Sequence, residues 1–418
     1  MRLLKVLNKK IGCKRERIFL SCCLFAAYFT SQFNAMSLVK EEYLYFKPHI
    51  LTFSDHGLAL LLLTIPVLFL PLGSTSTAAT AWAFYCFIYF SAIVSGIGLF
   101  QTKIEFINFI KMVAFGGLVT ILGSCIKLPV LQSTKINFNF FAFMLFACVV
   151  LVIYTWGLSG FTFLGGLKTI YERRFAAREN PSYVGYVIAP LRLAVPLLAI
   201  FAWQIRKNLL WIFVAIFGAI SLFSYEGSKA SLIFPALLWL ILLGLRKNKL
   251  PAVLLLSLLA LNLLARAEFL LFGSSHLIWH GVRRIIVVPG MIATFYWNYA
   301  PSVENLNNIT FQIGQKYFGD AQCNANTNYL MWGWLWAGWF GVALIAWMAG
   351  LVVSVFGSYP GKRFPCLGAL MAAGCIFFWS EQFLHTSMLS SGVVLLVAIA
   401  ILIGIIPNGF SKIAPKTS

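Results

Sequence analysis

The sequence predicts an all-α polytopic integral membrane protein with about twelve transmembrane helices. Of its 418 residues, 60% are hydrophobic and only 11% are charged. The apolar residues gather in stretches of about 20, which is the length of helix that crosses a bilayer. Ordinary soluble domains, in which apolar residues make up roughly 45–50%, are therefore excluded. We expect a single membrane domain over residues 1–418.

The expected spans follow the apolar stretches in order along the chain. The first stretch follows a basic N-terminus without a convincing cleavage site, which favours a signal-anchor span over a removed signal peptide. The twelve stretches lie at residues 18–36, 57–73, 78–100, 110–131, 138–157, 184–203, 208–224, 230–245, 250–265, 329–357, 366–380 and 388–407.

Basic connections predict the orientation. The positive-inside rule places the segment before the first span, which is rich in Lys and Arg, in the cytoplasm. Every later tight basic connection then also lies inside, and both termini are cytoplasmic. Three long segments lie outside: 37–56, 158–183 and 266–328. The net charge of +20 is spread over these short connections, which indicates topology determinants and contacts with anionic lipid, not nucleic-acid binding.

The longest outer segment, 266–328, carries the strongest candidate site. Its apolar part, residues 277–299, would bury Arg283 and Arg284 if it crossed the membrane, at roughly 2.5–3.5 kcal/mol each. We therefore expect an amphipathic helix on the outer face, with His280 and both arginines on one side of it. Arginine forks match phosphate oxygens, so this face is expected to bind a phosphate. Anchoring at lipid headgroups is the alternative.

Other charged residues form a second group of candidates. The outer segment 158–183 carries three arginines, and Arg192 lies between two prolines in the sixth span, where it would face a polar cavity or extend to the headgroups. Lys229 opens the eighth span, where it would bind an anion or pair with Glu226. Asp320 and Glu304 are candidate bases or simply solvated loop acids. The loop arginines are Arg173, Arg174 and Arg178.

No motif predicts a cofactor or a metal site. The nine cysteines show no metal-ligand spacing, and Cys323 is the one that clearly lies outside, so a disulfide framework is not expected. Asp-x-Asp, Walker and HExxH motifs are absent from the sequence. ATP-driven and zinc-protease functions are therefore excluded.

Three features of the chain resemble bacterial O-antigen polymerases of the Wzy type. The first is the layout of about twelve spans with two arginine-bearing outer loops. The second is the motif Gly-Ser-Lys-Ala-Ser at 227–231, which opens a span. The third is Asn324-Ala-Asn326 before an aromatic-rich span that contains Gly338 and Gly341.

This resemblance implies a GT-C-like fold in the bacterial inner membrane and a metal-independent glycosyltransferase. It would polymerise O-antigen repeat units of lipopolysaccharide at the periplasmic face, transferring a glycan from undecaprenyl diphosphate to a second lipid-linked unit. Arg283 and Arg284 would stabilise the departing diphosphate, with His280 or Asp320 as acid or base. Membrane lipid and a chain-length regulator protein are expected partners. The residues expected to grip phosphates or glycan are Arg173, Arg174, Arg178, Arg192, Lys229, Asn324 and Asn326.

The resemblance leaves other functions open besides that of a polymerase. An O-antigen ligase shares the layout and the lipid diphosphate donor. A flippase needs charge along a path reached from both sides, whereas charge here gathers at the outer end, with Lys127 as the exception. A membrane acyltransferase would need a histidine-centred pattern that is missing. Aromatic residues of the outer segments would stack on sugars or form the interfacial belt; they are Trp279, Tyr296, Trp297, Tyr299, Tyr329 and Trp332.

Overall fold

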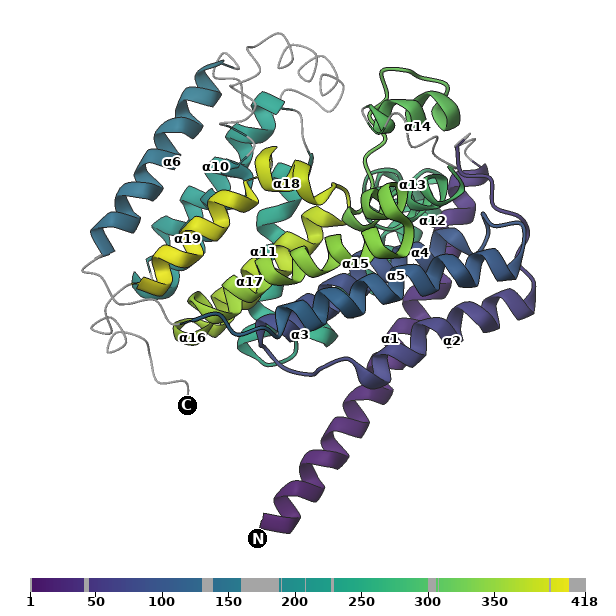
Figure 1. Ribbon diagram of the computed structural model, residues 1–418, viewed down its shortest axis with the longest axis horizontal. Helices are drawn as coiled ribbons and strands as arrows, with labels where there is room; N and C mark the ends of the chain where they lie inside the picture. The colour runs from purple at the N-terminus through teal and green to yellow at the C-terminus, as the bar shows by residue number, and fades with distance from the viewer. Residues whose placement is uncertain are drawn as a thin grey trace.

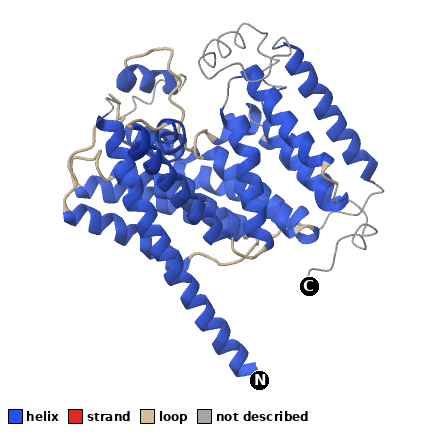
Figure 2. Cartoon of the chain, turned by 180° about the vertical axis from the view of Figure 1, so that it is seen from behind, coloured by secondary structure: helices blue, strands red, loops and turns tan. Residues whose placement is uncertain are grey.

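In the computed structural model, the described residues form helices joined by loops, and they contain no strand (Figures 1 and 2). The described residues are 2–40, 45–129, 138–158, 188, 190–206, 208–226, 229–299, 306, 308–390 and 392–405. The helices are α1 (Arg2–Lys40), α2 (Phe53–Phe69), α3 (Ser76–Phe84), η1 (Tyr85–Tyr89), α4 (Phe90–Gly96), α5 (Lys103–Ser124), α6 (Phe138–Leu158), α9 (Leu191–Arg206), α10 (Leu210–Glu226), α11 (Lys229–Arg246), α12 (Leu250–Phe272), η3 (Ile278–Val287), α13 (Val288–Asn298), α14 (Ile309–Phe318), α15 (Tyr329–Ser358), α16 (Pro360–Arg363), α17 (Pro365–Trp379), α18 (Leu384–Ser390) and α19 (Val393–Ile405).

Each predicted span overlaps a helix, and the all-α class is confirmed. Five helices are long and apolar enough to cross a membrane: Lys14–Val39, Ser76–Gly96, Lys103–Ser124, Leu250–Phe272 and Tyr329–Ser358. Shorter apolar helices occupy the positions of the remaining predicted spans. These helices fit a membrane-embedded chain, and the count of twelve crossings stays a prediction.

Large apolar side chains on the outside of the bundle also fit apolar surroundings. On α1, Phe25 and Phe33 are 41% and 62% exposed. On α5, Leu118 and Leu122 are 55% and 59% exposed. Exposed apolar patches of this kind mark surfaces that meet lipid or another protein.

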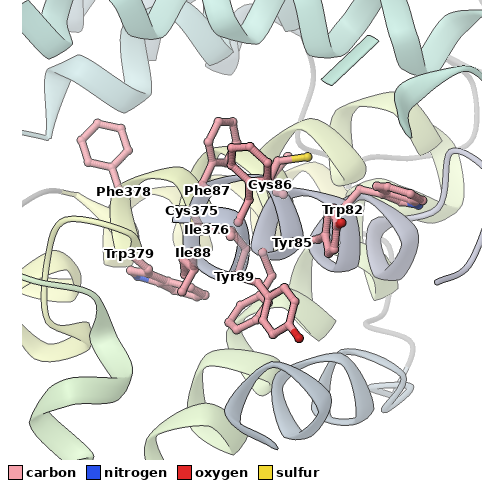
Figure 3. Packing of buried hydrophobic residues seen from close by; sticks show 14 of the residues in the cluster. Trp82, Tyr85, Cys86, Phe87, Ile88, Tyr89, Cys375, Ile376, Phe378 and Trp379 are labelled. Atoms are coloured by element: carbon pink, nitrogen blue, oxygen red, sulfur yellow. The ribbon is translucent and has the colours of Figure 1, made fainter. Parts of the chain in front are cut away.

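The centre of the bundle is the helical run of α3, η1 and α4. In the apolar window of this run, 94% of the residues are buried, whereas the corresponding share is 39–50% in the other four long apolar helices. The tyrosines of η1 are held by hydrogen bonds from Tyr85 Oη to Leu63 O (2.7 Å) and from Tyr89 Oη to Leu62 O (3.1 Å). Figure 3 shows η1 packed with the side chains of α17, and the rings of Phe87 and Phe377 lie 5.2 Å apart. A helix that is apolar all round is suited to this enclosed position.

Connections predicted on the outer side contact one another at one end of the bundle, called here the outer end. Lys103 Nζ lies 3.1 Å from Asp55 Oδ1, which joins the starts of α5 and α2. The ring of Tyr45 lies 4.8 Å from that of Phe318 at the end of α14. In Figure 1, α14 and α18 lie at this upper end.

Connections predicted on the inner side meet at the opposite end, called here the inner end. Lys249 Nζ lies 3.5 Å from Glu16 Oε1, and Leu128 N donates a hydrogen bond to Ser358 Oγ (3.0 Å). In Figure 1, α1 begins and α19 ends on this lower side. The connections therefore separate into the two groups that the even-numbered topology predicts, while the side that faces the cytoplasm stays a prediction.

Helix α15 is broken, although residues 329–357 were predicted as one continuous span. Ala337 (φ −149°, ψ 27°) and Gly338 (φ 55°, ψ −133°) leave the helical conformation. The half-helices then approach so closely that a Cβ atom on Gly333 would lie 2.5 Å from Gly341 O. Glycine permits both the positive φ and the close approach. The half-helix 329–336 is therefore a separate element at the outer end.

Candidate functional site

Residues 277–299 form two consecutive helices, η3 and α13. Glu268 and Ser275 hold the beginning of η3, because Glu268 Oε2 accepts hydrogen bonds from Leu277 N (2.9 Å) and Ser275 Oγ (2.7 Å). Ser275 Oγ in turn accepts one from Ile278 N (3.0 Å). The first amide groups of a helix have no partner inside it, so these bonds fix where η3 starts.

The apolar face of η3 is covered by α1, α4 and α12. Its wide π-helical turn leaves carbonyl groups available, and serines of α4 use them. Ser91 Oγ donates to Ile286 O (2.5 Å), and Ser95 Oγ donates to Val287 O (2.9 Å). Gly290 passes so close to the backbone of Ser91 that no side chain fits there. The segment is thus fixed within the bundle, with a polar side left for its charged residues; π-helical turns often occur at functional sites.

Arg283 and Arg284 extend toward different parts of the structure. The Arg283 Nε donates to Trp279 O (3.0 Å), and its guanidinium lies 4.9 Å from the centre of the Trp279 ring. Arg284 is exposed; burial raises the pKa of both Cys323 and Glu381, and the Arg284 charge opposes that rise in each. The rings of His276 and His280 lie 6.2 Å apart. The two adjacent arginines therefore interact with different groups, Arg283 with Trp279 and Arg284 with Cys323 and Glu381.

Glu381 is a residue that the sequence analysis did not single out. It lies in the turn between α17 and α18 and is exposed to solvent, yet desolvation by the surrounding protein raises the pKa of its carboxyl. The Arg284 charge acts in the opposite direction by favouring the carboxylate. The ion pairs of the described residues do not include these two, so the Arg284 charge acts on Glu381 without a direct ion pair. A sequence signal existed, because Glu381 is the only acidic residue after Asp320.

His385 lies one turn beyond Glu381, in α18. Its ring is 5.1 Å from that of Trp332 and 5.7 Å from that of Phe383. The protein around it lowers its pKa and so favours the neutral imidazole. A hydrogen bond from Trp379 Nε1 to Ser387 Oγ (2.7 Å) attaches α18 to α17. The turn that carries Glu381 and His385 is therefore held at both of its ends.

Tyr296 of α13 joins the elements around these residues. Its Oη donates to Ala325 O (3.0 Å) in the loop before α15, and its ring lies 5.7 Å from that of Phe383. The half-helix 329–336 begins with Asn328, whose Oδ1 accepts a hydrogen bond from Leu330 N (3.1 Å). We call Arg284, Glu381, His385 and Trp332 the outer site.

The loop before α15 contains three of the predicted residues. Asp320 Oδ1 accepts a hydrogen bond from Gln322 N (2.8 Å), so this carboxylate stabilises its own turn. Asn324 is exposed, and its carbonyl oxygen accepts a hydrogen bond from Asn326 N (3.0 Å). The cap of α15 is Asn328, and neither of the two predicted asparagines supplies it. Asp320 therefore has a structural role that Glu381 does not have.

The remaining charged candidates are placed only in part. Arg192 is half-buried in the first turn of α9. A Cβ atom on Gly392 would lie 2.5 Å from Pro190 Cα, which puts the start of α9 beside the connection after α18. Lys229 is the first residue of α11. Arg173, Arg174, Arg178 and Glu304 lie outside the described residues.

The aromatic candidates separate into packing residues and available ones. Tyr296 and Tyr329 are 0% exposed, so they neither stack on a sugar nor form an interfacial belt. Trp297 stacks on Trp334, with 4.2 Å between ring centres. Trp332 and Trp336 lie parallel at 6.0 Å, and Trp336 is 42% exposed. These two tryptophans are the aromatic surface next to His385.

The outer site can place a positive charge and a proton acceptor near one another. Within the described residues, no group of three or more His, Cys, Asp or Glu side chains is arranged to hold a metal ion. Comparison of the chain with protein-family models, with curated proteins and with solved structures finds no match. Function is therefore argued from the chain's own residues.

Proposed function

We propose that the chain is an O-antigen polymerase of the Wzy type that uses undecaprenyl-diphosphate-linked oligosaccharides. The observation that carries this proposal is the turn between α17 and α18, which places Glu381 and His385 beside Trp332, with 5.1 Å between the rings of His385 and Trp332, and within the electrostatic influence of Arg284. Glycosyl transfer from a lipid diphosphate needs a cation for the leaving group and a base for the attacking hydroxyl. The outer site offers both groups.

In the proposed reaction, the terminal sugar hydroxyl of one lipid-linked unit attacks the anomeric carbon of the growing glycan. The new glycosidic C–O bond forms as the bond between the anomeric carbon and the diphosphate oxygen breaks. The hydroxyl proton moves to the Glu381 carboxylate, and undecaprenyl diphosphate leaves with the bonding electron pair. Arg284 stabilises the negative charge that develops on it. The raised pKa of Glu381 makes it a stronger base than an ordinary glutamate.

Other residues have supporting roles in this proposal. Trp332 and Trp336 present ring faces on which sugars can stack, beside His385 as a second proton carrier. Arg283 and His280 support the phosphate-binding face of η3. Further contacts to phosphates or glycan are assigned to Arg173, Arg174, Arg178, Arg192, Lys229, Asn324 and Asn326. A chain-length regulator protein is a proposed partner.

The proposed setting is the bacterial inner membrane, with a GT-C-like arrangement of twelve crossings, cytoplasmic termini and the outer site in the periplasm. Single cysteines at exposed positions test this orientation. A membrane-impermeant maleimide added to intact spheroplasts should label Gln322→Cys, in the loop before α15, and should not label Lys362→Cys at the inner end. The reverse pattern would place the outer site in the cytoplasm and end the proposal.

The activity is tested with purified protein in nanodiscs and one lipid-diphosphate-linked repeat unit, with EDTA and without nucleotide. A ladder of products that grows in repeat-unit steps, and that disappears in Arg284→Gln, supports the metal-independent polymerase. Transfer of a preformed glycan to lipid A core without a ladder would make the chain a ligase. Movement of the lipid-linked unit across the bilayer without transfer would make it a flippase.

A further inference from the structure

A cavity of about 400 Å³ lies at the inner end of the bundle. It is formed where α3 begins, where α5 and α15 end, and along α16. We call it the inner cavity and define it by Ser76, Thr77, Ser124, Lys127, Ser358 and Lys362. Its volume far exceeds the roughly 30 Å³ that one water molecule occupies, so a tetrahedral anion fits.

The charge of the inner cavity has one sign. Lys127 and Lys362 both line it and are both exposed, and none of its lining residues is acidic. The two lysines come from different connections, one after the end of α5 and one in the helix α16. They are therefore not neighbours in a single solvent-exposed run of charged residues. Two ammonium groups and several hydroxyl groups are donors suited to a phosphate.

Ser76 is the second, independent indication of a ligand. Its side chain is only 7% exposed. In the part of the chain that the structure describes, its hydroxyl has no hydrogen-bond partner, and it lines the cavity. Gly357 and Gly361 lie against it, so that a Cβ atom there would be 3.6 and 3.4 Å from Ser76 Oγ. The hydroxyl therefore faces the cavity and is available to donate a hydrogen bond to a ligand there.

The backbone at the same place also offers donors. The N-cap Thr75 accepts a hydrogen bond from Ala78 N (3.1 Å) through its side chain. Among the described residues, the amide groups of Ser76 and Thr77 are not donors in any hydrogen bond outside the helices, and the first amides of a helix have no intrahelical acceptor. They lie at the positive end of a helical run that reaches Gly96. An anion in the cavity would face amides, a hydroxyl and ammonium groups together.

The opposing explanation is that the lysines only neutralise the C-terminal carbonyls of α5 and α15. Those carbonyls already have donors. Ser124 Oγ donates to Ile121 O (2.6 Å), Cys125 N to Leu122 O (3.0 Å) and Ile126 N to Gly123 O (3.2 Å). On α15, Tyr359 N donates to Val355 O (3.0 Å). Neither lysine is needed as the donor to these carbonyls, so both ammonium groups are available to a ligand.

We infer that the inner cavity binds a phosphate group. It is carried by the headgroup of a membrane lipid or is a free phosphate ion. Ile126 at the rim of the cavity and Leu122 one turn earlier on α5 are exposed and apolar, so acyl chains can lie along the same helix. This site lies at the opposite end of the bundle from the outer site and does not depend on the proposed function.

The test uses purified full-length protein and its thermal unfolding, followed by tryptophan fluorescence. Inorganic phosphate is titrated at constant ionic strength against chloride, first in neutral detergent. The protein is then placed in nanodiscs of phosphatidylcholine with or without phosphatidylglycerol. A ligand that binds only the folded protein raises the Tm in proportion to the logarithm of its concentration above Kd.

Three variants locate the site. Lys127→Gln and Lys362→Gln should each weaken binding by about tenfold or more, since each removes a charge-assisted donor. Ser76→Ala should weaken binding while leaving the ligand-free protein about as stable as wild type, because no hydrogen bond within the described residues uses this hydroxyl. Weaker binding without a loss of stability distinguishes a binding role from a structural one. Lys47→Gln, an exposed lysine at the outer end, is the matched control and should bind like wild type.

The outcomes of this test distinguish a lipid headgroup from a free phosphate ion as the source of the bound phosphate. Stabilisation by inorganic phosphate that the cavity variants lose supports a free-phosphate site. Stabilisation by phosphatidylglycerol alone, lost in the same variants, supports a headgroup site. If neither phosphate nor phosphatidylglycerol stabilises the wild type, or if all variants respond equally, the inference is overturned.

Discussion

The outer site and the inner cavity both combine fixed positive charge with helix ends, but they differ in the groups that can move a proton. Arg284 at the outer end lies near Glu381, whose pKa is raised, and the same turn carries His385. The inner cavity has two lysines and hydroxyl groups and no carboxylate. Holding an anion needs only fixed donors, whereas glycosyl transfer also needs a base. The difference assigns chemistry to the outer end and binding alone to the inner end.

The backbone also differs between the two ends: it is regular around the inner cavity and irregular around the outer site. At the inner end, α3 begins with an ordinary threonine cap, and α5 and α15 end in helical turns, with Ser124 Oγ donating to Ile121 O and Tyr359 N donating to Val355 O. The outer end contains the π-helix η3 and the break of α15 at Gly338. Irregular helix also occurs in the buried core, at η1, but of the two ends compared here the outer one carries it, and such departures often occur at functional sites.

The largest expected effect is that of Glu381→Gln. The amide keeps the shape of the side chain but cannot accept the hydroxyl proton, so polymer formation should fall by about 10²–10⁴-fold. Initial rates of ladder formation with purified protein measure this. Binding of the lipid diphosphate should change little, because the phosphate is assigned to Arg284.

The control for that variant is Glu105→Gln, the same change at an exposed residue in the first turn of α5. Its rate should equal that of wild type. Full activity of Glu381→Gln would show that Glu381 is not the base. The outer site would then differ from the inner cavity in no group shown to accept a proton.

The two adjacent arginines should differ in importance. Arg284→Gln removes the charge next to Glu381 and should lower kcat by about 10²–10³-fold. Arg283→Gln loses a contact between the half-buried Arg283 and the Trp279 ring, worth roughly 0.5–2 kcal/mol, and should lower the rate by only a few fold. Equal losses in the two variants would show that both arginines serve one phosphate, as their spacing in sequence first indicated.

The pH dependence of the reaction rate tests the electrostatic coupling between Arg284 and Glu381. The base must be deprotonated to act, so the rate should rise with pH through the raised pKa of Glu381. Arg284 lowers that pKa, and its removal raises it further. The acidic limb of kcat/KM against pH should therefore move to higher pH in Arg284→Gln and less so in Arg284→Lys, which keeps a charge. An unmoved limb in both variants would assign the titration to another group.

Much of the helical layout was predictable, because a bilayer imposes stretches of about 20 apolar residues. Each predicted span overlaps a helix, and the predicted outer and inner connections meet at opposite ends. The break in α15 was not predictable from hydropathy, since Ala337 and Gly338 are themselves apolar. Only the conformation of Gly338 and the contact of Gly333 with Gly341 reveal it.

The candidate site was predictable only in part. The pattern of His280, Arg283 and Arg284 assumed an α-helix, and the π-helical turn of η3 changes which of these side chains are neighbours. Glu381 is a single acidic residue between two apolar stretches, a pattern that indicates an ordinary loop residue. The effect of the surrounding protein on its pKa becomes evident only in the folded chain. Ser76 looked like any serine of a turn, because a missing hydrogen-bond partner is a property of the folded chain.

The break in α15 should be intolerant of larger residues. Gly333→Ala would place a methyl group 2.5 Å from Gly341 O, and overpacking of this kind typically costs about 1–3 kcal/mol. The Tm of the purified variant should fall, and activity should fall with it, because the half-helix that carries Trp332 must shift. Gly57→Ala is the matched control, since a methyl group there meets nothing within 4 Å and alanine favours the helix.

The smallest effect is expected for Asp320→Asn. Asp320 was a candidate base in the sequence, but its carboxylate accepts the amide of Gln322 in a turn (2.8 Å). An asparagine oxygen accepts the same bond and forms the same kind of turn, so the rate of polymer formation should change by less than about threefold, well under the loss of 10²-fold or more expected when a general base is removed. Asp320→Ala removes the acceptor and should lower stability more than it lowers the rate. A loss of activity in Asp320→Asn as large as that in Glu381→Gln would mean that the proton leaves toward the loop before α15, and Arg284 would then serve only the diphosphate.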